Sequence, residues 1–268
     1  MIISFQRGYI FFGMPKTGST TLHYLLGNRS DSDIVLSRVD HGKHHHCAAA
    51  VRDFKEIFAL YPYSNFIKFG VIRDPVKLIS SWYRIWSSDK LADPTNANHH
   101  CWLEGRTLEE FVAELESPEY NGPRRYPSAQ DFYTLDDGTL GVDFLVRNEH
   151  MSEDLAALET VLPLGLAEVV DNTRLNVQSN QRGVAKKLDI GPELQDRIYR
   201  LFAADVQLYK DTPEINRKFL DSNPIAPVWF EGAEHFRQTY PDLYRANKND
   251  KLRLRVKRSL VGIGLYKD

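Results

Sequence analysis

Short apolar runs alternate along the chain with segments in which apolar residues recur every three or four positions. Residues 7–13 form a β-rich apolar run, and helical spacing follows, with Leu22, Leu25 and Leu26 on one face. The succession continues with predicted strands over residues 33–38, 65–72 and 141–146 and predicted helices over 47–60, 75–86 and 152–161. Alternating strands and helices predict an α/β fold with a central parallel sheet and right-handed crossovers. Ligands then bind at the carboxyl ends of the strands.

The second half of the chain is less regular. Residues 88–106 are polar and irregular, and we expect an acceptor-side insertion over residues 88–130. Within it, Thr107 and Glu110 have the spacing of a capping box at the start of a helix. A long helix is predicted from Pro192 to Tyr209. The pattern predicts a main domain over residues 1–222 and an extension over 223–268.

Composition narrows the class of protein. The chain has 268 residues, of which 42% are hydrophobic and 26% charged, which suits one globular domain. The net charge is only −2, although seven Lys or Arg stand against two Asp from residue 248 onward, a local charge of +5. We therefore expect no nucleic-acid partner, and at most a weak contact of this basic tail with an anionic surface. We expect a cytoplasmic protein. The chain has only two cysteines, no apolar run of membrane-spanning length, and a first segment with the pattern of a strand.

A turn-rich loop between the first strand and its helix has the character of an anion site. Backbone N–H groups at such a junction bind phosphate, and Gly18 allows close approach of the ligand. Lys16 precedes the glycine, whereas a Walker loop carries its lysine after the last glycine. The residues predicted to bind here are Pro15, Lys16, Thr17, Gly18, Ser19, Thr20 and Thr21.

A second candidate phosphate site follows the predicted strand over residues 65–72. Arg73 ends that strand, and Asp74-Pro75 opens the next helix. Ser81 lies about two helical turns further on. A guanidinium fork and a hydroxyl at these places can share one phosphate. Two phosphate sites on successive strand–helix crossovers fit a bisphosphorylated nucleotide.

These two motifs resemble those of sulfotransferases that use 3′-phosphoadenosine 5′-phosphosulfate (PAPS). Residues 15–22 resemble the 5′-phosphosulfate loop of that family, and residues 73–83 its 3′-phosphate motif. Residues 126–130 and 142–149 resemble later segments of the carbohydrate branch, which includes heparan 2-O- and chondroitin-type enzymes and bacterial relatives. The resemblance implies a P-loop-kinase-like, three-layer α/β fold. It also implies sulfuryl transfer from PAPS, without a metal, to a hydroxyl of a glycan or glycolipid.

The resemblance also implies catalytic residues. Lys16 matches the family's lysine that stabilises the leaving phosphate. A histidine suits the role of general base because its pKa lies near working pH. Related enzymes often have a Lys-His-x-Ser/Thr-Ala segment at the start of a helix. Alignment of Cys47-Ala48 with its Ser/Thr-Ala selects His45 as the base, while alignment from Lys43 selects His44. His46 is a third candidate. A capping imidazole in a polar loop is the purely structural alternative.

Several further residues are candidates for contact with ligands. Arg124, Arg125 and Gln130 are predicted to bind the acceptor, and Arg182 to lie near the nucleotide 3′-phosphate. Arg147 and Glu149 are expected to form a structural ion pair. Two His-His-Cys runs, over residues 45–47 and 99–101, leave a zinc site as an alternative, although no metal is predicted.

Two other functions remain open at this stage. One is an ATP-dependent small-molecule kinase, which the position of Lys16 disfavours. The other is a nucleotide-binding protein without catalysis, which the presence of both Lys16 and a histidine in register disfavours.

Overall fold

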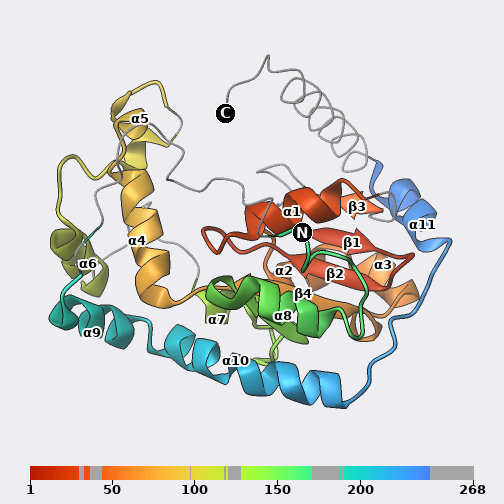
Figure 1. Ribbon diagram of the computed structural model, residues 1–268. Coiled ribbons are helices and arrows are strands. Elements are labelled where there is room, and N and C mark those ends of the chain that lie inside the picture. The colour runs from red at the N-terminus through yellow and green to blue at the C-terminus, as the bar shows by residue number, and fades with distance from the viewer. Residues whose placement is uncertain are drawn as a thin grey trace.

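The computed structural model describes residues 1–29, 33–36, 44–96, 98–117, 119, 128–170, 188 and 190–241. Its centre is a five-stranded sheet in the order β3-β1-β2-β4-β5 (Figure 1). The strands are β1 Ile2–Ser4, β2 Tyr9–Phe12, β3 Ile34–Val35, β4 Ile67–Ile72 and β5 Phe144–Arg147. The predicted α/β class is confirmed.

The sheet is parallel in one half and antiparallel in the other. Strands β2, β4 and β5 run parallel, as predicted, whereas β1 pairs antiparallel with both β2 and β3. The hydrophobic pattern predicts one strand at the start of the chain, where the structure has both β1 and β2. Only residues 5–8 connect these strands, too few for a crossover between parallel neighbours, so they form a hairpin.

Helices cover both faces of the sheet: every residue of β2 and β4 is buried although successive side chains point to opposite faces. Ile10 and Phe12 pack on the side of α2 Cys47–Asp53, α3 Lys55–Leu60, α7 Ala129–Tyr133 and α11 Gly232–Thr239. Tyr9 and Phe11 pack on the side of α1 Ser19–Gly27 and α8 Met151–Leu158. The result is the three-layer arrangement expected from the sequence.

A third apolar cluster lies beyond the sheet around α4 Pro75–Trp86. The helices around it are α5 Asp89–Ala92, the 3-10 helix η3 His99–Cys101, α6 Leu108–Glu116 and α9 Pro192–Leu201. Figure 1 shows this group on the left of the molecule, beside the sheet. Thr107 and Glu110 form the predicted capping box of α6. The segment after residue 88 therefore contributes to a small core of its own.

Two predicted helices are each divided into two. The helix predicted over 47–60 breaks at Phe54 into α2 and α3, and the one predicted from Pro192 breaks at Phe202. After Phe202, α10 Ala203–Asp221 runs along the free edge of β5. Asn216 of α10 accepts from the Leu145 N–H at 2.9 Å and donates to the Leu145 carbonyl at 2.8 Å. One amide side chain thus covers a backbone pair that an edge strand exposes.

The remaining short elements are the 3-10 helices η2 Tyr63–Asn65 and η4 Asn148–His150. Among the helices described here, none is both long enough and apolar enough to cross a bilayer.

Candidate functional site

The loop from Gly13 to Gly18 joins β2 to α1 at the carboxyl end of the parallel strands. The hydroxyls of Thr17 and Ser19 both donate to the Met14 carbonyl, at 2.9 and 2.7 Å. Both side chains are buried. Because these hydroxyls hold the Met14 carbonyl to the base of the loop, the backbone can turn its N–H groups to a ligand, as anion-binding loops do.

The backbone conformation and surroundings of position 18 favour glycine over every other residue. Its φ of 82° is left-handed, and a Cβ atom there would lie 2.3 Å from the Nδ2 of Asn148. That Asn148 amide donates to the Thr17 carbonyl at 2.9 Å. Lys16 also has a positive φ of 64°, unusual for a residue with a side chain. The loop therefore has a specific, partly strained shape held from outside by η4.

Arg73 joins this loop to the next strand–helix junction. It follows β4, and its Nη1 donates to the Lys16 carbonyl at 2.9 Å. Its side chain is 23% exposed, and its Nε lies 3.9 Å from the Glu149 carboxylate. Burial lowers the pKa of Arg73, the negative charge of Glu149 opposes that shift, and the positive charge of Arg84 adds to it. This hydrogen bond thus joins Arg73, of the second predicted phosphate site, to the loop predicted as the first.

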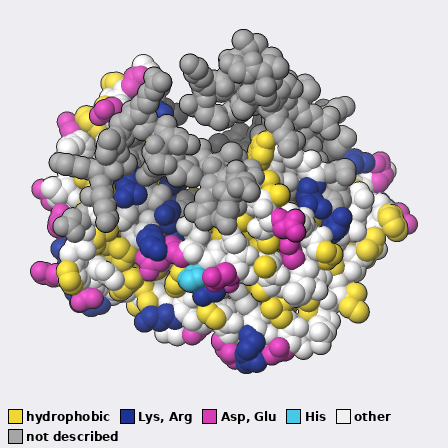
Figure 2. All heavy atoms as spheres, viewed as in Figure 1, with side chains coloured by type: hydrophobic (Ala, Val, Ile, Leu, Met, Phe, Trp, Pro, Cys, Tyr) yellow, Lys and Arg dark blue, Asp and Glu magenta, His cyan; other side chains and the backbone are white. Residues whose placement is uncertain are grey.

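Ser81 and its neighbours on α4 complete the second junction. Ser81 is buried, and no hydrogen bond joins its hydroxyl to another residue that the structure describes. Lys77 and Arg84 lie four residues before and three after it, on the same helical face. In the view of Figure 2, basic side chains gather over the region that α4 occupies in Figure 1. This face of α4 offers one hydroxyl between two cations.

The N-terminus of α4 is fixed by hydrogen bonds. Asp74 is its N-cap and accepts from the Lys77 N–H at 3.1 Å, and Pro75 takes the first helical position. The Tyr199 hydroxyl of α9 donates to the other Asp74 oxygen at 3.0 Å. The Asp-Pro pair seen in the sequence therefore places Arg73 and Ser81 on a rigid corner.

The three consecutive histidines point to different partners. The Nδ1 of His44 lies 2.5 Å from the Gly13 carbonyl, at the start of the loop. The Nε2 of His45 lies 3.0 Å from Asp53, without the alignment of a hydrogen bond. Burial lowers the pKa of both His45 and His46, and Asp53 partly opposes this for His45. His46 is the N-cap residue of α2 and its ring lies 4.7 Å from that of Phe132.

Other predicted site residues fall into two groups. Gln130 is described: its Nε2 donates to the Thr134 hydroxyl at 3.0 Å, and its backbone N–H donates to Asp205 at 3.0 Å. The predicted acceptor and nucleotide residues Arg124, Arg125 and Arg182 lie outside the described residues.

The expected ion pair between Arg147 and Glu149 is wrong. Arg147 makes a two-pronged contact with Asp154 of α8, at 2.9 and 2.7 Å. Helix α8 begins four residues after Arg147, so its first turn brings Asp154 back to the strand end. Glu149 instead faces Arg73 and Lys77, and this role had no local signal in the sequence.

The two His-His-Cys runs form no metal cluster in the part of the chain that the structure describes, where no group of three potential ligands comes together. Cys47 and Cys101 are both free and buried. Burial raises the pKa of the Cys47 thiol to about 12, which disfavours the thiolate that a metal needs.

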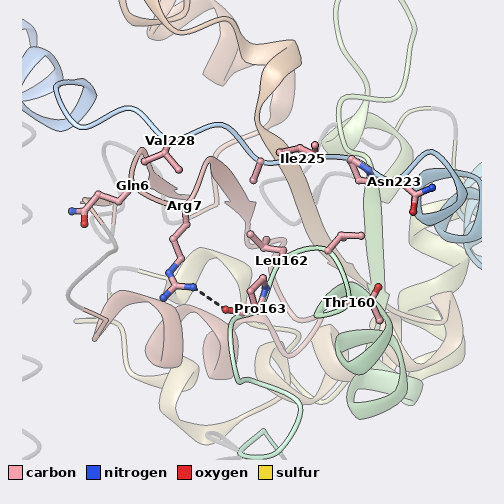
Figure 3. Close-up of a pocket in the computed structure, with 11 residues that line it drawn as sticks. Gln6, Arg7, Thr160, Leu162, Pro163, Asn223, Ile225 and Val228 are labelled. Atoms are coloured by element: carbon pink, nitrogen blue, oxygen red, sulfur yellow. Dashed lines mark hydrogen bonds between the residues drawn. The ribbon is translucent and has the colours of Figure 1, made fainter.

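A hollow of about 680 Å³ lies elsewhere, at the opposite end of the parallel strands (Figure 3). Its lining includes Arg7 from the β1–β2 turn, Pro163 after α8 and Ile225 after α10. The Arg7 Nη1 donates to the Pro163 carbonyl at 2.9 Å. This hollow is separate from the loop over residues 13–18 and from Arg73.

The fold is α/β, and two adjoining strand–helix corners at the carboxyl edge of its sheet carry the residues predicted to bind anions. The model of the sulfotransferase family matches residues 1–210, and the chain belongs to this family. It is therefore a transferase of sulfuryl groups. Comparison with curated proteins and with solved structures found no match.

Proposed function

We propose that this sulfotransferase moves the sulfuryl group of PAPS to a hydroxyl of a carbohydrate acceptor. The observation that carries the proposal is the hydrogen bond from Arg73 to the Lys16 carbonyl, which ties two anion-binding corners into one site. A nucleotide with phosphates at both its 3′ and 5′ ends suits such a pair. A nucleotide with phosphates at the 5′ end alone uses only one corner.

The reaction is an in-line displacement. The acceptor oxygen attacks sulfur, the new S–O bond forms, and the S–O bond to the 5′-phosphate breaks. The acceptor proton passes to a base, and adenosine 3′,5′-bisphosphate leaves. Positioning and charge stabilisation supply most of the acceleration in such transfers. Lys16, in the loop, is the cation we assign to the leaving oxygen.

Two imidazoles compete for the role of base. The register of the sequence motif selects His45, while the contact with Gly13 favours His44 because it brings that ring to the loop. His45 is engaged with Asp53, which suits either a base oriented by a carboxylate or a capping residue. Comparison of the single alanine variants, described below, decides between them.

Nucleotide selectivity tests the proposal. Adenosine 3′,5′-bisphosphate should raise the Tm clearly more than ATP at equal concentration, because only the former reaches both corners. Equal shifts with the two nucleotides would instead support a kinase. The carbohydrate acceptor rests on the resemblance of residues 126–130 and 142–149 to the carbohydrate branch. A screen with labelled PAPS against glycans, glycolipids and phenols tests it, and turnover on phenols alone would contradict it.

A further inference from the structure

Glu149 is a carboxylate placed among the cations of the second anion-binding corner. Its side chain is only 12% exposed. One oxygen, Oε2, accepts from the Tyr209 hydroxyl at 3.0 Å and lies 3.4 Å from the Asp74 backbone N–H. The other, Oε1, lies 3.9 Å from Arg73 Nε and 3.6 Å from Lys77 Nζ, without a hydrogen bond in the described structure.

These contacts fix the carboxylate from behind and leave its other oxygen facing the cations. Tyr209 belongs to α10 and Asp74 caps α4, so two separate helices hold Oε2. Because Oε2 is anchored, Oε1 stays on the side of Arg73 and Lys77. A carboxylate that served only as a mobile counter-ion needs no such anchoring.

The guanidinium of Arg73 is correspondingly constrained on two sides. Its Nε edge faces Glu149, and one Nη1 N–H is used by the Lys16 carbonyl. A guanidinium carries five N–H donors in one plane, so three remain. Because these two contacts restrict the guanidinium, they also restrict the direction of its remaining donors.

We propose that Glu149, held by Tyr209, is a positioning residue that orients Arg73 and Lys77 toward the 3′-phosphate of the nucleotide. The inference rests on the proposed use of PAPS. It adds a pair of residues that do not touch the reacting atoms but set the direction of the guanidinium that does bind phosphate.

A purely electrostatic role leads to the opposite expectation. A negative charge near an anion site repels the nucleotide, so its removal alone should tighten binding. If Glu149 orients Arg73, its removal should weaken binding although a repulsive charge is lost. The sign of the change therefore separates the two roles.

The first variant is Glu149→Gln, which keeps the size of the side chain. The amide has one oxygen, so it cannot both accept from Tyr209 and present an oxygen to Arg73. We expect the Kd for adenosine 3′,5′-bisphosphate, measured by calorimetry, to rise about tenfold. The Kd for adenosine 5′-diphosphate, which lacks the 3′-phosphate, should change less than twofold. In turnover, KM for PAPS should rise while kcat stays close to that of wild type.

The matched control is Glu153→Gln. Glu153 lies four residues away, at the start of α8, and its carboxylate is 76% exposed beside His150. This variant removes the same charge without touching Arg73, and it should bind both nucleotides as wild type does. Unchanged or tighter binding of the bisphosphate by Glu149→Gln would overturn the proposal. An equal loss for both nucleotides would do so too, because it would indicate a general structural defect.

A second variant, Tyr209→Phe, keeps the test decisive should Glu149→Gln fail to fold. It removes only the hydroxyl that holds Oε2, and we expect about a threefold rise in the Kd of the bisphosphate alone. Tyr240→Phe is its control, because Tyr240 donates to a different carboxylate, Glu56 of α3, at 2.6 Å. Tyr209→Phe with wild-type affinity would contradict the role of Tyr209 as the anchor.

Failure of this inference differs from failure of the proposed function. If wild type binds neither bisphosphate nor PAPS, the function itself is wrong, whatever the variants do. If wild type prefers the bisphosphate and both variants keep that preference, the function stands and the positioning role falls.

Discussion

The side-chain amide of Asn148 donates to the Thr17 carbonyl and at the same time occupies the space where a Cβ of Gly18 would lie. Asn148, the first residue of η4, thus sets both the shape of the loop over residues 13–18 and the residue that fits at position 18. This contact joins positions 131 residues apart in the chain.

Gly18→Ala should weaken nucleotide binding strongly, because the left-handed φ and the contact with Asn148 both oppose a methyl group. We expect a loss of stability of about 1–3 kcal/mol, the usual cost of such backbone strain. Gly138→Ala is the matched control, since Gly138 has nearly the same φ of 83° but nothing within 4 Å of its Cβ position. Urea unfolding and nucleotide titration of the two variants isolate the contribution of Asn148. Equal behaviour of both variants would show that this contact is unimportant.

Arg73→Ala should raise the Kd for adenosine 3′,5′-bisphosphate by about tenfold to a hundredfold, a typical loss for a charged hydrogen-bonding partner. It also frees the Lys16 carbonyl, so the loop itself should bind less well. Arg52→Ala serves as the control, because Arg52 forms an exposed pair with Asp136. Calorimetric titration of the three proteins provides the comparison.

Lys16→Ala should instead act mainly on turnover. Charge builds up on the leaving oxygen only in the transition state, so the lysine is expected to lower kcat more than it raises the Kd of the nucleotide. Single-turnover rates with saturating PAPS measure this directly. A variant with normal kcat and poor binding would show that the roles assigned to Lys16 and Arg73 are reversed.

One of the three histidines should prove essential as general base. Its alanine variant is expected to lose about 10²–10⁴-fold in turnover with little change in nucleotide affinity. A loss confined to His45→Ala supports the register of the sequence motif, whereas a loss confined to His44→Ala supports the residue that contacts Gly13. If all three variants remain active, the base lies outside this segment.

Stability should fall on the acid side of neutrality. Burial lowers the pKa of His45 from its ordinary 6.5, so the folded protein binds this proton less readily than the unfolded chain does. The stabilisation is therefore fully present above pH 6.5 and is lost as the pH falls through the lower folded value. Urea unfolding at pH 7.5 and 5.5 should show a smaller loss for His45→Gln than for wild type.

The places of the two candidate binding motifs in the fold could be predicted because each motif is local. Residues 14–22 and 73–81 each run from a strand through a turn into a helix, and each position follows from that order. Contacts between these motifs leave no such pattern. Asn148 and Glu149 reach the site from η4 and Tyr209 from α10, and no local sequence pattern indicates their partners. Arg147 pairs with Asp154 because the first turn of α8 returns to the strand end, a contact that spacing along the strand does not indicate.

Strand directions show a similar division. The parallel part of the sheet follows from strand–helix alternation, whereas β1 is three residues long and merges with β2 in the hydrophobic pattern. The hairpin between them depends on a four-residue turn with Gly8 at a φ of 60°. A turn of this kind hardly changes the mean hydropathy of the segment, so the hydrophobic pattern does not reveal it.

Helix α10 does two things at once, since Tyr209 holds Glu149 and Asn216 covers the edge of β5. The match to the family ends at residue 210, between these two side chains. A protein shortened to the matched region would keep the phosphate loop, Arg73 and Tyr209. It would nevertheless expose the backbone N–H and carbonyl of Leu145 at the edge of the sheet. An exposed strand edge can pair with strands of other molecules. A minimal domain cut by family boundaries alone is thus a candidate for self-association.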